Sequence, residues 1–152
     1  MPVSMSYLHL LFFLLIFSFN PTHSFHHDRL SLLAFKSLIT SDPCHSMADW
    51  SPANPFCNWT GVTCDRHHPN RVASLNLTKM DLRGSISPLL GNLSFLRSLD
   101  ISENALIGHI PPQLGRLFRL RELSLDNNGL GGNIPSQILI LTWLGSLNFY
   151  LA

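Results

Sequence analysis

The chain has 152 residues, with 10 Lys and Arg against 9 Asp and Glu, so its formal net charge at pH 7 is +1. A charge this close to zero excludes the basic footprint of a nucleic-acid-binding protein and a polybasic membrane patch. Charged residues make up 12% and hydrophobic residues 45%, a composition that argues against disorder for the bulk of the chain. At most one domain fits this length, and a protein kinase or a doubly wound nucleotide enzyme does not fit easily.

The amino end is predicted to be an export signal, residues 1–24. Leu8–Phe19 is an apolar run that is shorter than the roughly 20 residues needed to span a bilayer. Pro21 and the small residues Thr22 and Ser24 follow, so we expect cleavage after Ser24. The segment before the run has no Lys or Arg, and an uncleaved anchor is therefore the alternative. Export places the protein in the secretory pathway and the extracellular space.

Export affects how the three cysteines are interpreted, because disulfides form in the secretory pathway. Cys57 and Cys64 lie close together in the sequence, and an oxidising lumen allows them to pair. Cys44 is then left over, as a free thiol, an intermolecular partner or a neutral substitution.

Export also gives meaning to three glycosylation sequons, which begin at Asn58, Asn76 and Asn92. Proline follows Asn20 and excludes that position.

A helix is predicted over Asp28–Thr40, with Asp28 as its N-cap and Pro43 ending it. Apolar residues spaced for one helical face are Leu30, Leu33, Ala34 and Leu38. Bulky residues then follow at Trp50, Phe56, Trp59 and Val62. We expect helix and bulky residues to form a cap over the first coil of the repeats that follow.

A 24-residue repeat covers the second half of the chain. Apolar residues return at the same positions of each period, in the columns Val72/Leu96/Leu120/Leu144, Leu75/Leu99/Leu123/Leu147, Leu77/Ile101/Leu125/Phe149, Leu82/Leu106/Leu130, Ile86/Ile110/Ile134, Leu90/Leu114/Ile138 and Leu93/Leu117/Leu141. The pattern LxxLxLxxNxL at this period is the signature of a leucine-rich repeat.

Each repeat is predicted to contribute one short strand and two turns. Asn104 and Asn128 stand where an amide side chain can satisfy backbone groups inside the bend. Glycine returns at Gly84, Gly108 and Gly132, where a second turn needs positive φ. A helical alternative fails, because glycine and proline recur in every period. The fold class is therefore an α/β repeat: a right-handed leucine-rich-repeat solenoid with short parallel strands and an amino-terminal helical cap.

The segments DRLSLLAFKSLITSDP and CNWTGVTC and the repeats reading LxGxIPxxLGxL resemble the start of plant receptor-like kinase ectodomains. Ser85–Ser102 is similar to the subfamily of immune receptors that perceive microbial patterns. The resemblance implies an extracellular recognition module whose relatives continue into more repeats, a membrane span and a Ser/Thr kinase. It also places Cys57 and Cys64 inside the cap motif, which implies their pairing and leaves Cys44 free. The departures from the pattern are Met80 in the Asn position, Ser87 in the Pro position, Leu139 in a Gly position, and Cys44.

The domain organisation that follows is a signal at 1–24, a cap at 25–71, three repeats at 72–143 and the start of a fourth at 144–152. The uncharged segment Ile138–Ala152 invites interpretation as a membrane anchor. It is shorter than a bilayer requires, and it continues the repeat register. We expect the isolated chain to be marginally stable and to associate through this end.

Ligand-binding residues are expected on the concave face, among side chains that lie outside the apolar columns. The best candidates are Asp100, Glu122, Ser124 and Asp126, since an acidic cluster suits a basic peptide. An ordinary solvated polar face is the alternative, and a glycan on Asn76 would favour it.

Catalysis, metals and cofactors find no support in the sequence. The motifs GxSxG, HExxH and HRD are missing. Cysteine spacing does not suit zinc, and the doublets His26-His27 and His67-His68 lie in polar stretches. The predicted function is non-enzymatic recognition of a protein or peptide ligand, with a co-receptor ectodomain as a further partner. The alternatives are a short secreted inhibitor or adaptor of the polygalacturonase-inhibitor type, and a truncated product without a function of its own.

Overall fold

The computed structural model describes residues 22–139, 141 and 146–148. The predicted export signal falls almost wholly outside these residues, as do Leu144 and Phe149 of the predicted fourth strand. Within the described residues, no helix has the length and apolar character that crossing a membrane requires.

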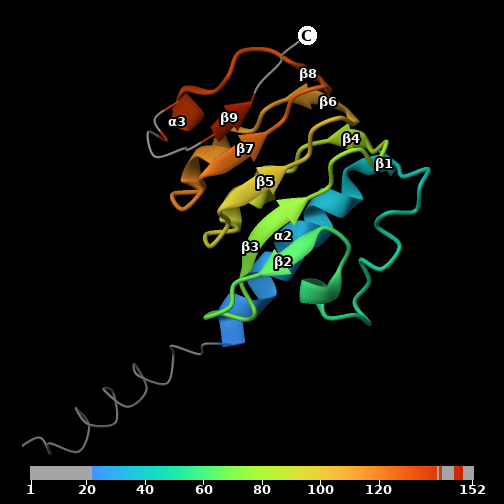
Figure 1. Ribbon diagram of the computed structural model, residues 1–152, viewed down its shortest axis with the longest axis vertical. Helices are drawn as coiled ribbons and strands as arrows, with labels where there is room; N and C mark the ends of the chain where they lie inside the picture. Colours follow the sequence, from blue (N-terminus) through green and yellow to red (C-terminus); the bar gives the residue numbers. More distant parts are fainter. Residues whose placement is uncertain (1–21, 140, 142–145, 149–152) are drawn as a thin grey trace, which may run out of the picture.

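Five short strands form a sheet that runs along the stack of coils (Figure 1). They are β2 (Val62–Cys64), β3 (Val72–Asn76), β5 (Ser98–Asp100), β7 (Glu122–Ser124) and β9 (Ser146–Asn148), in that order. The cap strand β2 pairs antiparallel with β3, and the other pairs are parallel. Leu75, Leu99 and Leu123 are direct partners, so neighbouring strands are offset by one 24-residue period. This confirms the predicted fold class.

A second sheet closes each coil on another side, in the order β1 (Ile39–Ser41), β4 (Arg83–Ser85), β6 (Ala105–His109) and β8 (Gly129–Gly131). Again the first pair is antiparallel and the others are parallel. The turn glycines Gly84, Gly108 and Gly132 have φ values of 144°, 87° and 81°. The predicted need for positive φ at this position is therefore confirmed.

Short helical segments complete the coils: the 3-10 helices η2 (Pro88–Asn92) and η3 (Pro112–Arg116), and α3 (Ser136–Leu139). Proline precedes η3, whereas Ser87 precedes η2. The Ser87 hydroxyl is buried and accepts a hydrogen bond from Leu89 N at 3.2 Å. The serine thus caps the segment in place of the expected proline.

The core is a continuous column of leucines and isoleucines between the strands and the outer segments. Exposure is at most 4% for the buried repeat positions Val72, Leu75, Leu77, Leu82, Ile86, Leu90, Leu93, Leu96, Leu99, Ile101, Leu106, Ile110, Leu114, Leu117, Leu120, Leu123, Leu125, Leu130, Ile138 and Leu141. Full burial of one such side chain stabilises the fold by about 1.5–3 kcal/mol. Stacking of coils supplies this burial, because each coil alone leaves one apolar face open.

Two asparagines tie consecutive coils together. Asn104 Oδ1 accepts from Met80 N and Leu82 N in the preceding coil, at 3.1 and 3.0 Å. Its Nδ2 donates to Leu77 O at 2.8 Å. Asn128 Oδ1 likewise accepts from Leu106 N at 3.0 Å. Met80 stands in the Asn position of the first repeat, and its side chain packs partly buried against the core.

The cap helix differs from the sequence prediction in extent and in its buried face. Helix α2 spans Thr22–Ser37, so it ends before β1 and well before Pro43, and Asp28 lies inside it rather than at its N-cap. The predicted apolar face was wrong at Leu30 and Leu38, which are 55% and 38% exposed, whereas Leu33 is partly buried against the core. The buried positions are instead Asp28, Ser31, Leu32 and Phe35.

Hydrogen bonds explain why a carboxylate is buried there. Asp28 Oδ2 accepts from Val72 N at 2.8 Å and from Arg71 Nε at 3.2 Å. Ser31 Oγ donates to His27 O at 2.9 Å. A buried polar group is tolerated when it is bonded, so the helix turns two polar residues inward and anchors itself to β3 through Asp28.

The rest of the cap is built around aromatic rings and one disulfide. Trp50 and Trp59 stack with ring centroids 5.3 Å apart, and both are buried. The disulfide joins Cys57, in the 3-10 helix η1 (Phe56–Asn58), to Cys64 at the end of β2. Cys44 is an exposed free cysteine. The cap therefore covers the first coil with ring stacking and a covalent link.

Candidate functional site

Polar side chains of β3, β5 and β7, and of the residues that follow these strands, form a polar face on the five-stranded sheet. Its described members are Ser74, Asn76, Thr78, Ser98, Asp100, Ser102, Glu122, Ser124 and Asp126. Strand pairing aligns Ser74, Ser98 and Glu122 in one row. Asn76, Asp100 and Ser124 form the next row. Three of the four predicted ligand-binding residues thus lie on paired strands, and Asp126 is the second residue after the end of β7.

One carboxylate oxygen of Asp100 is used in hydrogen bonds within the fold. Its Oδ1 accepts from Ser102 Oγ at 2.6 Å and from Ser102 N at 3.1 Å. Ser102 is itself buried and lies 3.2 Å, Oγ to Oγ, from Thr78. A half-buried carboxylate with these bonds shapes the face and keeps Oδ2 as an acceptor.

Glu122, Ser124 and Asp126 differ in how freely they meet solvent. Glu122 is exposed, whereas Ser124 and Asp126 are half-buried. Asp126 Oδ2 accepts from Asn127 Nδ2 at 3.1 Å. These side chains give the polar face an acidic character that suits a basic ligand.

The sequon asparagines Asn58, Asn76 and Asn92 are all exposed. Asn58 lies in the cap and Asn92 ends η2. Asn76 lies on the polar face itself, and its Oδ1 accepts from Thr78 N at 3.2 Å. A glycan on Asn76 would cover the cap end of the polar face, so the part left open centres on β5 and β7.

The doublet His67-His68 surrounds a buried carboxylate next to the sheet. Asp65 accepts from both backbone N–H groups, from the His68 ring at 3.0 Å, and from Arg97 Nη2. The side-chain hydrogen bond from His68 is the main cause that lowers the pKa of Asp65 from 3.8 to about 2. The backbone bonds and the Arg97 charge act in the same direction, and desolvation opposes them.

One column of residues was missed by the sequence reasoning. Arg71, Phe95 and Arg119 follow each other at the 24-residue period. Both guanidinium groups lie against the Phe95 ring, at 4.3 and 4.2 Å from its centroid. The signal was present in the sequence, because the period that aligns the leucines also aligns these three residues.

Two family profiles match this chain. The family profile "Leucine rich repeat N-terminal domain" matches residues 25–65. The profile "Leucine Rich Repeat" matches residues 95–117 and 119–141. The chain belongs to the leucine-rich-repeat family. The first match covers the cap with its disulfide, and the second covers two coils of the solenoid.

Proteins similar to this chain include plant receptor kinases and their ectodomains. The chain is 51% identical over 71 residues to the LRR receptor-like serine/threonine-protein kinase EFR of Arabidopsis thaliana, covering 46% of this chain and 7% of the kinase. It resembles the structure of the BIR3–SERK2 complex from Arabidopsis thaliana, with a TM-score of 0.70 and 40% identity, covering 78% of this chain and 65% of that one. It also resembles the Arabidopsis receptor kinase HAESA in complex with the peptide hormone IDA and the co-receptor SERK1, with a TM-score of 0.69 and 31% identity, covering 79% of this chain and 20% of that one. This leucine-rich-repeat chain spans less than a tenth of the EFR kinase.

Proposed function

We propose that this chain is a non-catalytic recognition module of an extracellular receptor ectodomain, corresponding to the cap and first repeats of a plant receptor-like kinase. The observation that carries the proposal is the polar face, where strand pairing aligns acidic and hydroxyl side chains over β5 and β7. The disulfide of the cap and the exposed sequons fit an extracellular protein.

The ligand proposed for the polar face is a basic peptide segment. HAESA, a structural neighbour, is seen with a peptide hormone, which supports a peptide as the ligand class. Glu122 and Asp126 offer carboxylates to a basic side chain, and Asp100 keeps one oxygen for the same purpose. Charge complementarity of this kind chiefly sets specificity and the association rate.

The experiment measures binding of the secreted chain to the probe peptide acetyl-Gly-Lys-Ser-Lys-Gly-Arg-Gly-amide by biolayer interferometry. We expect saturable binding that E122Q/D126N weakens about tenfold or more, because charge-assisted hydrogen bonds are lost. The matched control is D81N, which removes one exposed carboxylate outside the polar face, and it should retain the affinity of the unmodified chain. Equal affinity of E122Q/D126N and the unmodified chain would refute a ligand site on this face.

A further inference from the structure

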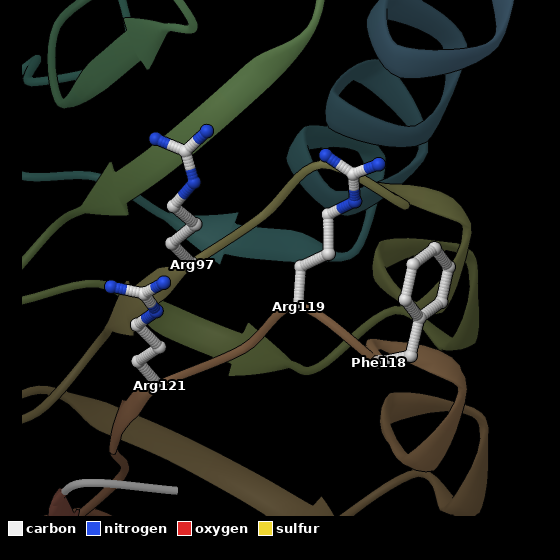
Figure 2. Close-up of a pocket in the computed structure, with 4 residues that line it drawn as sticks. All are labelled: Arg97, Phe118, Arg119 and Arg121. Carbon is white, nitrogen blue, oxygen red and sulfur yellow. The ribbon is translucent and has the colours of Figure 1, made fainter. Parts of the chain in front are cut away.

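A second surface beside the polar face has the geometry of a binding site. An open hollow of about 480 Å³ is lined by Arg97, Phe118, Arg119 and Arg121 (Figure 2). Arg97 immediately precedes β5 and Arg121 immediately precedes β7. Figure 2 shows the three guanidinium groups extending in the same general direction, with the Phe118 ring beside Arg119. Four exposed side chains from two coils therefore meet around one hollow.

Two of these arginines are held by the surrounding fold. Arg97 Nη2 donates to the buried carboxylate of Asp65. The Arg119 guanidinium lies 4.2 Å from the Phe95 centroid and 5.6 Å from that of Phe118. Cation–π contacts at these distances favour one orientation of a long side chain. Less side-chain freedom is then lost when a ligand binds.

Behind Arg119, the Phe95 ring is fastened to the cap. Arg71 lies 4.3 Å from the same ring centroid. Its Nη2 donates to Ser94 Oγ at 2.7 Å, and its Nε donates to Asp28 of helix α2. This chain of contacts connects the cap helix to the wall of the hollow.

The charge of the hollow is positive but small. Asp65 offsets Arg97. Across the part of the chain that the structure describes, no carboxylate forms an ion pair with Arg119 or Arg121. Phe118 is 57% exposed and gives the hollow an apolar wall next to these two cations.

We propose that this hollow binds a short acidic segment of a partner protein, with carboxylates on Arg119 and Arg121 and an apolar side chain against Phe118. Guanidinium groups suit carboxylates because their planar N–H donors match the two carboxylate oxygens. The surface lies outside the polar face, so this proposal goes beyond the basic ligand proposed there.

A protein segment fits these observations better than a long acidic polysaccharide. A uniform polyanion needs a continuous cationic track, whereas here Glu122 follows Arg121 directly and the whole chain carries a net charge of only +1. A peptide supplies one or two carboxylates together with an apolar side chain, which is the combination that the two cations and the exposed ring accept.

The test uses the full secreted chain and the fluorescein-labelled probe acetyl-Gly-Glu-Ser-Glu-Leu-Gly-amide in a fluorescence anisotropy titration. We expect saturable binding that weakens as salt rises, since screening reduces the attraction between exposed charges. The same peptide with Gln in place of both Glu residues should bind about tenfold more weakly or not at all.

Variants of the protein then test whether the probe binds at Arg119 and Arg121. R121Q and R119Q/R121Q should each weaken binding, the double variant by about tenfold or more. The matched control is R83Q, which removes an equal charge from exposed Arg83 on β4 and should bind the probe as the unmodified chain does. R121Q is the decisive single variant, because Arg119 also covers Phe95 and its loss disturbs packing; circular dichroism verifies that each variant is folded.

Unchanged affinity in R121Q and R119Q/R121Q, or equal affinity for the Glu and Gln probes, would overturn the proposal. Displacement of the probe by a galacturonate oligomer that binds more tightly than the peptide would replace the acidic segment with an acidic polysaccharide and would also overturn it. E122Q/D126N should leave binding of this acidic probe intact, which separates failure here from failure of the site on the polar face.

Discussion

Leu99 shows how a single residue connects the sequence period to stability. It is fully buried and pairs with Leu75 on one side and Leu123 on the other. Ser98, one residue earlier, is half-buried on the polar face. Because side chains alternate between the two faces of a strand, the core residue Leu99 is adjacent to Ser98, whose side chain lies on the other face.

Leu99→Ala should therefore destabilise the fold by about 2–5 kcal/mol, through lost burial and the cavity that remains. Ser98→Ala should change stability by no more than about 0.5 kcal/mol, as surface substitutions do. Denaturant titration of both variants measures the difference. Similar losses in the two variants would contradict the strand register.

Asp65 makes the stability of the fold depend on pH, and the direction follows from its lowered pKa. Its pKa is lowered from 3.8 to about 2 in the fold, so the folded state favours the charged carboxylate. The stabilisation is complete above the unfolded pKa of 3.8 and is lost as pH falls toward 2.

Asp65→Asn should accordingly be less stable than the unmodified chain at pH 7, and the gap in unfolding free energy should shrink between pH 4 and pH 2. Asp81→Asn is the control, because Asp81 is exposed. Denaturant titrations at several pH values test this. A gap that stays constant down to the lowest pH would show that the carboxylate charge is not the cause.

At the scale of elements, the repeats and the presence of a cap helix could be predicted from the sequence, whereas the bounds and the buried face of that helix could not. A repeat column samples the same environment in every coil, so Leu75, Leu99 and Leu123 report one buried position three times. Helix α2 occurs once, and its buried face includes Asp28, whose hydrogen-bond partner Val72 is 44 residues away. Apolar periodicity misses such a face, because long-range hydrogen bonds decide it.

The candidate site, too, could be predicted only in part from the sequence. Asp100, Glu122 and Ser124 lie on strands whose register follows from the leucine period, so their place on one face was predictable. The basic hollow was not predicted, because Arg71, Phe95 and Arg119 alternate cation and ring at one repeat position instead of repeating one residue type. Arg119 acquires its position from the Phe95 ring of the previous coil, a contact between coils that no single repeat reveals.

The side chains of Asn104 and Asn128 link adjacent coils by hydrogen bonds. Asn104→Ala would remove the acceptor of Met80 N and Leu82 N and the donor to Leu77 O. An unsatisfied buried backbone group costs about 1–3 kcal/mol, so we expect a loss of at least about 2 kcal/mol for the set. Asn133→Ala, at an exposed position, should be close to neutral. Unfolding by denaturant tests the pair, and equal small losses would argue against the asparagine as a structural link.

At the scale of the whole molecule, the spacing of coils depends on glycines in the outer segments. An added Cβ at Gly91 would lie 2.2 Å from Gln113 O in the next coil, and one at Gly115 would lie 2.5 Å from Gln137 O. Each distance is far below van der Waals contact, so η2, η3 and α3 stack closely only because these positions lack a side chain. Leu139 occupies the same position in the third coil and is 58% exposed.

Gly91→Ala should therefore force adjacent coils apart and destabilise the solenoid by about 1–3 kcal/mol, the usual cost of overpacking. Gly131→Ala is the matched control, since a Cβ there would meet nothing within 4 Å. Thermal and denaturant unfolding of the two variants measure the difference. Because the clash is with backbone rather than with a flexible side chain, rotamer changes cannot relieve it. A Gly91→Ala protein as stable as Gly131→Ala would show that the coils can shift freely, and close stacking would then not govern their spacing.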